Sequence, residues 1–78
     1  MPRLPIMSPR EFLKHLRAFG CSVVSVSGSH HKLHNPETGM RTTLAIHSGK
    51  DVTKAVFADI LVQLGIDVDE FLAFIKNT

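Results

Sequence analysis

The sequence contains one cysteine, Cys21, and no paired metal-binding motif of the C-x-x-C or H-E-x-x-H type. A single cysteine excludes an internal disulfide, is typical of a protein from a reducing compartment, and is most often a small core residue. No apolar run approaches the ~20 residues of a membrane-spanning helix, and the first nine residues lack the apolar region of a signal peptide. We therefore expect a cytoplasmic protein that does not contact the membrane.

The chain is short and unevenly charged. Its 78 residues have room for one domain (1–78) and none for a separate cofactor-binding domain, so we expect no cofactor. Residues 1–54 hold eight basic and three acidic side chains together with all five histidines, whereas residues 55–78 hold one basic and four acidic side chains. Such an asymmetry is typical of a protein with a polyanionic partner, although a small solvated domain also carries it without one.

The distribution of apolar and turn residues predicts an α+β protein. Ser8, Thr53 and Asp67 are placed to cap helices, and Gly28-Ser29 is a turn typical of a β-hairpin. The predicted segments are a helix over 8–20, strands over 21–27, 30–35 and 40–47, a helix over 53–65, and a short helix over 67–78. This α-β-β-β-α-α order predicts a three-stranded antiparallel sheet with helices on one face.

Three of the five histidines lie in the stretch GSHHKLH, residues 28–34. Side chains alternate between the two faces of a strand, and Leu33 is the only strongly apolar residue of 30–35, so its face should lie against the helices. His31 shares that face. The residues predicted on the open face are His30, Lys32 and His34 from this strand and Arg41, Thr43, Ala45 and His47 from the next, where Met40, Thr42, Leu44 and Ile46 form the inward set.

The histidine-rich strand has three interpretations. A metal site is disfavoured, because His30 and His34 lie about 13 Å apart along a strand, too far for one zinc ion with bonds near ~2 Å. A solvated strand without a ligand is the second. The third is RNA cleavage without a metal, which needs a base for the 2′-hydroxyl proton and cations for the charge that develops on the phosphate. Lys32 and Arg41 are candidate phosphate ligands, and the N–H groups of Gly28 and Ser29 are candidates for an anion cradle.

Three motifs, taken together, resemble a known family. GSHH (28–31), HSGKD (47–51) and ILVQLGI (60–66) follow one another as they do in the HicA (YcfA-like) toxins, and the likeness spans residues 8–66. The resemblance implies a fold like that of a double-stranded-RNA-binding domain. It also implies the toxin of a type II toxin–antitoxin system, which cleaves mRNA without a metal by means of a histidine after the Gly-Ser pair. A HicB-type antitoxin is the implied protein partner.

Carried over to this chain, the essential histidine is His30 or His31. We predict His30, because the alternation of faces places it on the open face with Lys32, and we keep His31 as the second candidate. His47 matches a family position near the site and is expected to assist. The predicted RNA-binding residues are Gly28, Ser29, Lys32, Arg41 and Lys50.

Residues 67–78 extend past the part that resembles the family. Phe71, Phe74 and Ile75 make this segment more apolar than one small core needs, so we expect it to support self-association or antitoxin docking. The alternative to a ribonuclease is a module of the same fold that binds structured RNA by its shape and phosphates without cutting it.

Overall fold

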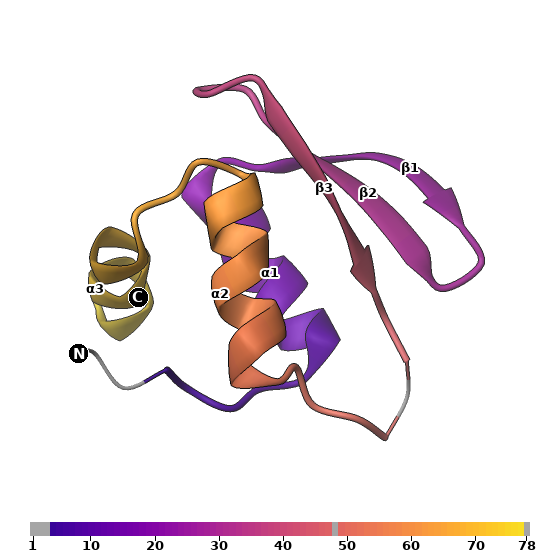
Figure 1. Ribbon diagram of the computed structural model, residues 1–78, viewed down its shortest axis with the longest axis horizontal. Helices are drawn as coiled ribbons and strands as arrows, with labels where there is room; N and C mark the ends of the chain where they lie inside the picture. The colour runs from indigo at the N-terminus through magenta and orange to yellow at the C-terminus, as the bar shows by residue number, and fades with distance from the viewer. Residues whose placement is uncertain (1–3, 48, 78) are drawn as a thin grey trace.

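The computed structural model describes residues 4–47 and 49–77, so Ser48 of the predicted loop and Thr78 of the last predicted helix lie outside the described residues. The elements, in chain order, are α1 (Pro9–Phe19), β1 (Ser22–Ser27), β2 (His30–Asn35), β3 (Met40–Ala45), α2 (Lys54–Gln63) and α3 (Val68–Lys76), as Figure 1 shows. The predicted α+β order is confirmed. No helix in the described part of the chain is both long enough and apolar enough to cross a membrane.

Each helix begins after its predicted capping residue, Ser8, Thr53 or Asp67. In all three, the side-chain oxygen accepts a hydrogen bond from the backbone N–H three residues later, at 3.0–3.2 Å. These bonds satisfy N–H groups that have no partner within the helix. The capping residues therefore fix where each helix starts, and with it which side chains face the core.

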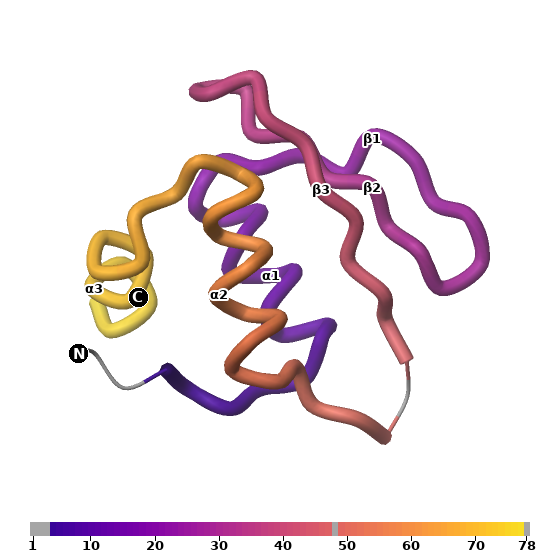
Figure 2. Tube along the Cα trace, in the orientation of Figure 1, coloured from indigo at the N-terminus to yellow at the C-terminus, as the bar shows by residue number. Residues whose placement is uncertain are grey.

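The three strands form one antiparallel sheet in the order β1-β2-β3. Figure 2 shows α1 and α2 on the same side of the sheet, with the turn that joins β1 and β2 projecting past the helices. The register between β1 and β2 shifts between Val23 and Ser25, so Val24 is an extra residue that bulges from the ladder. The predicted arrangement of helices on one face is confirmed, whereas the bulge was not predicted.

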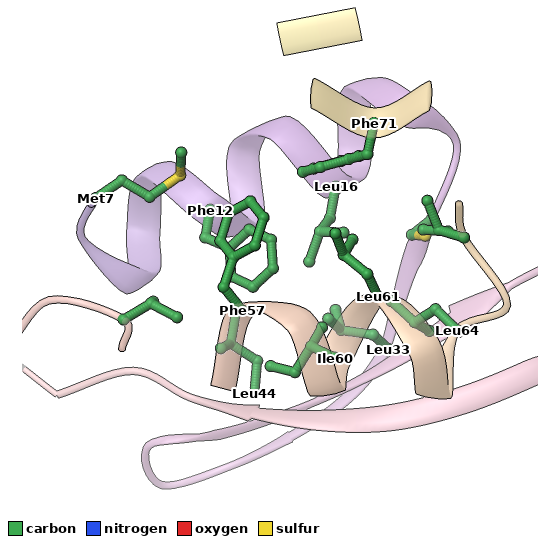
Figure 3. Close-up of a cluster of buried hydrophobic side chains, with 13 residues drawn as sticks. Met7, Phe12, Leu16, Leu33, Leu44, Phe57, Ile60, Leu61, Leu64 and Phe71 are labelled. Atoms are coloured by element: carbon green, nitrogen blue, oxygen red, sulfur yellow. The ribbon is translucent and has the colours of Figure 1, made fainter. Parts of the chain in front are cut away.

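The core lies between the sheet and the three helices, and aromatic rings form its centre (Figure 3). The rings of Phe12 and Phe57 are stacked with centroids 4.5 Å apart. Phe71, from α3, is fully buried and contacts both rings edge-on, at 6.0 and 5.9 Å. Thus α3 packs on α1 and α2 and completes the core. Phe74 and Ile75 of the same helix are half-buried, and their role in self-association or antitoxin docking stays a prediction.

Hydrogen bonds tie the turn between β2 and β3 to the end of α2. The buried Asn35 donates from Nδ2 to the carbonyl oxygen of Leu64 at 2.8 Å, and Thr38 donates from Oγ1 to the same oxygen at 2.8 Å. At the other end of the molecule, the N–H of Val52 donates to the carbonyl of Met7 at 2.8 Å, in an isolated bridge that was not predicted. These contacts hold both ends of α2 in place beneath β3.

Two details of the third strand differ from the prediction. β3 ends at Ala45, so His47 lies beyond the strand and not on its open face. Met40 lies on the helix-facing side as predicted, with its sulfur beside Gly65 after α2, but it is 42% exposed and not buried, because it is the first residue of β3, near the end of the sheet. Thr42 and Leu44 are buried as predicted.

Candidate nucleic-acid interface

The sheet has one face covered by helices and one open face without acidic side chains. None of the eighteen residues of the three strands is an aspartate or a glutamate. The described open-face residues are Ser22, Ser25 and Ser27 of β1, His30, Lys32 and His34 of β2, and Arg41, Thr43 and Ala45 of β3. The open face is therefore a surface of hydroxyl, imidazole and cationic groups, which is the composition that an anionic ligand requires.

The central strand presents its side chains as the alternation predicted. His30 and Lys32 are exposed, His34 is half-buried, and Leu33 between them is fully buried against the helices. His30 and Lys32 are two residues apart on one face, so their Cα atoms are separated by about 6.5 Å along the strand. An imidazole and an ammonium group thus share an exposed surface within reach of a single phosphodiester and its ribose.

Small polar residues flank the cations across the strands. Lys32 lies between Ser25 on β1 and Thr43 on β3, and directly opposed residues have Cβ atoms about 4.5–5.5 Å apart. His34 lies opposite Arg41. The imidazole and the guanidinium are therefore neighbours on the same face, where both have N–H groups that can donate to one anion.

The turn before His30 depends on its glycine. Gly28 has φ 59° whereas Ser29 has a negative φ, a combination found in type II′ hairpin turns. The carbonyl of Ser29 then accepts a hydrogen bond from the N–H of Ile46 at 2.7 Å, which joins this turn to the end of β3. The predicted turn residues therefore set the position at which β2 and its histidines begin.

His31 lies on the opposite face from His30, as predicted. It is half-buried, and its cross-strand neighbours are Val26 and the buried Leu44. Its Nδ1 is 3.2 Å from the carbonyl oxygen of Ser29. Because a carbonyl only accepts, this bond requires hydrogen on Nδ1 and leaves Nε2 as the basic nitrogen of the neutral ring. No described residue forms a hydrogen bond with the ring of His30.

The structure separates the predicted site residues into two groups. His30, Lys32 and Arg41 lie on the open face, whereas His47 and Lys50 are exposed around a hollow of about 470 Å³ beside the start of α1. Arg10 also lines this hollow, and Ile46 forms the part of it nearest the hairpin turn. His47 is thus at the edge of the sheet and does not share the face of His30, which corrects the prediction made from alternation.

The described residues form neither a metal site nor a reactive thiol site. Within residues 4–47 and 49–77, no three histidine, cysteine, aspartate or glutamate side chains come together as ligands for one metal ion. Cys21 is buried at the end of α1, and burial raises the pKa of its thiol above the ordinary value of 9.0. A thiol of that kind stays protonated and is a core residue, as predicted, not a nucleophile.

Sequence reasoning missed some of the residues that complete the interface. The serines of β1 were assigned to a strand without regard to their face, and only the register shows that Ser25 and Ser27 stand beside Lys32 and His30. Because Val24 bulges from the strand, the alternation of faces along β1 is interrupted, and simple alternation does not predict this placement. Arg10 was assigned to a helix, and the packing of the loop after β3 against α1 brings it to His47.

The arrangement supports two kinds of chemistry. Exposed Lys32 and Arg41, with the flanking hydroxyls, suit the binding of phosphate oxygens. Exposed His30 suits proton transfer near neutral pH, at a position that a bound ribose-phosphate chain can reach. Both need an extended anionic ligand that lies across the strands.

Most of the chain matches the sequence profile of a known family. Residues 9–66 match the sequence profile of a family described as the HicA toxin of bacterial toxin–antitoxin systems. The match includes α1, the whole sheet, α2 and the Gly-Ser turn, and it ends just before α3. No curated protein matches the chain.

Proposed function

The chain belongs to the HicA toxin family, and from this premise we propose that it is an endoribonuclease that cleaves mRNA in the cytoplasm without a metal ion. Family membership makes it the toxin of a bacterial toxin–antitoxin system, and it implies an antitoxin as protein partner. We take that antitoxin to be of the HicB type. The observation that carries the proposed activity is the exposed, acid-free sheet face on which His30 and Lys32 point outward together.

In the proposed reaction, His30 acts as the general base. Its ring takes the proton from a ribose 2′-hydroxyl, and the 2′-oxygen forms a bond to the adjacent phosphorus. The bond from phosphorus to the 5′-oxygen then breaks, and that oxygen accepts a proton from an imidazolium or from water. The products are a 2′,3′-cyclic phosphate and a 5′-hydroxyl. Lys32 and Arg41 stabilise the added negative charge of the transition state, with the N–H groups of Gly28 and Ser29 as further donors.

His47 and Lys50 contribute from the edge of the sheet. Both are exposed at the hollow that adjoins the hairpin turn, so they face the nucleotides on one side of the scissile bond. Lys50 is assigned to phosphate binding, and His47 is assigned to assist as a proton donor.

The experiment that tests the proposal is cleavage of a defined RNA in EDTA. We expect the wild-type chain to produce fragments with cyclic phosphate ends, and the variant His30→Ala to cleave at least about 100-fold more slowly, the typical contribution of a general base. His31→Ala is the matched control, because it removes the same group from the other face. Fast cleavage by His30→Ala together with an inactive, folded His31→Ala transfers the role to His31. Fast cleavage by the double variant refutes histidine catalysis.

A specific observation favours the second candidate function, RNA binding without cleavage. Catalytic imidazoles are usually oriented by a hydrogen bond to one ring nitrogen, and in the described part of the chain His31 has such a bond whereas His30 does not. If the chain only binds, RNA affinity remains salt-dependent but no product forms at any pH. If it cleaves, the rate follows a pH profile with the inflection of an imidazole.

A further inference from the structure

A row of cations runs along α1, on a surface that the proposed reaction does not use. Arg10, Lys14 and Arg17 are spaced four and three residues apart, so at about 100° per residue they lie within about 60° of one another around the helix axis. All three are exposed. The core residues of α1 are on the opposite side of the helix. We refer to Arg10, Lys14 and Arg17 as the α1 cation row.

The three cations of the row repel one another unless an anion lies among them. Like charges three and four residues apart destabilise a helix, and the helix dipole disfavours Arg10 in the first turn while it favours Arg17 in the last turn. None of the three side chains forms an ion pair with any residue in 4–47 or 49–77. Glu11, the acidic residue of the same helix, is about 100° from Arg10 and about 60° from Lys14 around the axis, and it forms an ion pair with neither. The arrangement therefore points to a ligand that supplies the missing negative charge.

The α1 cation row is long enough to contact several phosphates of one strand, and too long to surround a single phosphate. Arg10 and Arg17 are about 10 Å apart along the axis, at about 1.5 Å per residue. Together with Leu13, the three cations line a shallow hollow of about 270 Å³. Leu13 is the one apolar residue among the four that line this hollow. It is half-buried and packs against the core, so the surface of the hollow is mainly cationic.

The composition favours RNA over a protein as the occupant. Protein interfaces have a desolvated centre rich in aromatic and aliphatic side chains and are depleted in lysine, and the row has no such centre. Nucleic acids are bound by rows of lysine and arginine that contact successive phosphates. Arg10 also lines the hollow that holds His47 and Lys50, which adjoins the hairpin turn. This hollow, in which Asp51 is the one acidic residue beside Arg10, His47 and Lys50, thus links the proposed cleavage site to α1.

We propose that the α1 cation row binds the phosphates of the substrate RNA beyond the cleaved bond. This inference rests on the proposed function for the identity of the RNA as a substrate. The row extends the contact surface from the sheet around the edge of the molecule, so affinity depends on more of the strand than the nucleotides that react.

The test compares two variants of equal net charge, Lys14→Gln/Arg17→Gln and Lys54→Gln/Lys76→Gln. The control removes two exposed lysines from α2 and α3, and Arg10 is left intact because it also lines the hollow of His47. The probe is a short, labelled 2′-O-methyl oligoribonucleotide, which cannot be cleaved through its 2′-oxygen. Its affinity is measured over a series of salt concentrations, with circular dichroism to confirm that both variants are folded.

We expect the Lys14→Gln/Arg17→Gln variant to bind the probe roughly 2- to 30-fold more weakly than wild type. The slope of log affinity against log salt should become shallower by about 1.4, since each phosphate contact to a single strand contributes about 0.7. In the control variant Lys54→Gln/Lys76→Gln, both the affinity for the probe and the salt slope should stay close to the wild-type values. If the two variants bind RNA alike, the inference is wrong, and so it is if only antitoxin binding weakens.

Cleavage of an ordinary RNA by the wild-type chain separates this inference from the proposed function. If the wild-type chain cleaves RNA but the two variants bind the probe equally, the role of the row is overturned and the ribonuclease proposal stays intact. Weakened probe binding by Lys14→Gln/Arg17→Gln without cleavage of any RNA supports the row as an RNA-binding surface and overturns the catalytic proposal.

Discussion

Phe71 should contribute more to stability than any other residue of α3. Its side chain is fully buried, and its ring has three aromatic neighbours, Phe12, Phe19 and Phe57, at centroid distances of 5.3–6.0 Å. Substitution of Phe71 by alanine removes these contacts and leaves a cavity at the junction of the three helices. Phenylalanine-to-alanine changes in a core cost about 3–5 kcal/mol.

That cost is large for a chain of this size. At about 0.05–0.15 kcal/mol per residue, 78 residues have a free energy of unfolding of about 4–12 kcal/mol. The variant Phe71→Ala should therefore lose between about a quarter and all of its stability. For a domain of this length each kcal/mol shifts Tm by about 4–8 °C, so we expect a fall of at least about 12 °C.

The assay is urea or thermal unfolding followed by far-ultraviolet circular dichroism, because the chain has no tryptophan or tyrosine for fluorescence. Phe74→Ala is the matched control. Phe74 is half-buried and its one described ring contact is with Phe19, at 5.1 Å, so its loss should cost about 1–2 kcal/mol. A loss below about 1 kcal/mol for Phe71→Ala, or equal losses for both variants, would refute the conclusion that α3 completes the core.

Two further predictions concern groups buried elsewhere. Asn35→Ala should cost about 1–3 kcal/mol, because it leaves the buried carbonyl of Leu64 with one donor fewer and the N–H of Glu37 without its acceptor. Thr38→Val removes a donor to the same carbonyl and the acceptor of the Met40 N–H, but it should cost less in the same urea titration, because Thr38 is exposed whereas Asn35 is buried. Burial raises the pKa of the Cys21 thiol, so its contribution to stability is complete below the ordinary value of 9.0 and is lost as pH rises through the folded value. The wild-type urea midpoint should therefore fall relative to that of Cys21→Ala above about pH 9, and a constant difference between the two would contradict the assignment.

Local signals in the sequence predicted most of the fold. The capping residues Ser8, Thr53 and Asp67 start helices because a side-chain oxygen satisfies a free N–H wherever it occurs, which depends on a few neighbouring residues alone. Leu33 fixed the faces of β2 for a similar reason, since alternation is a property of any extended strand. The outward direction of His30 and Lys32 followed from the inward direction of Leu33.

Features that depend on distant parts of the chain were missed or predicted wrongly. His47 was extrapolated along β3, but the chain leaves the strand at Ala45 and turns back, so that Val52 pairs with Met7. The part that Phe71 of α3 plays in the core was not predicted, because apolar residues have the same pattern whether they meet the chain's own core or another protein. Only the packing of α1, α2 and α3 distinguishes the two.

The central claim is that an RNA strand lies across the open face of the sheet, beside the imidazole of His30. The most direct measurement is the set of imidazole ¹H–¹⁵N NMR signals of the five histidines during titration with a short 2′-O-methyl oligoribonucleotide. We predict the largest shifts for His30 and His34, and none for His15, which is half-buried on a part of α1 away from the sheet face and from the α1 cation row. Saturable RNA binding that leaves the signals of His30 and His34 unchanged would contradict the account.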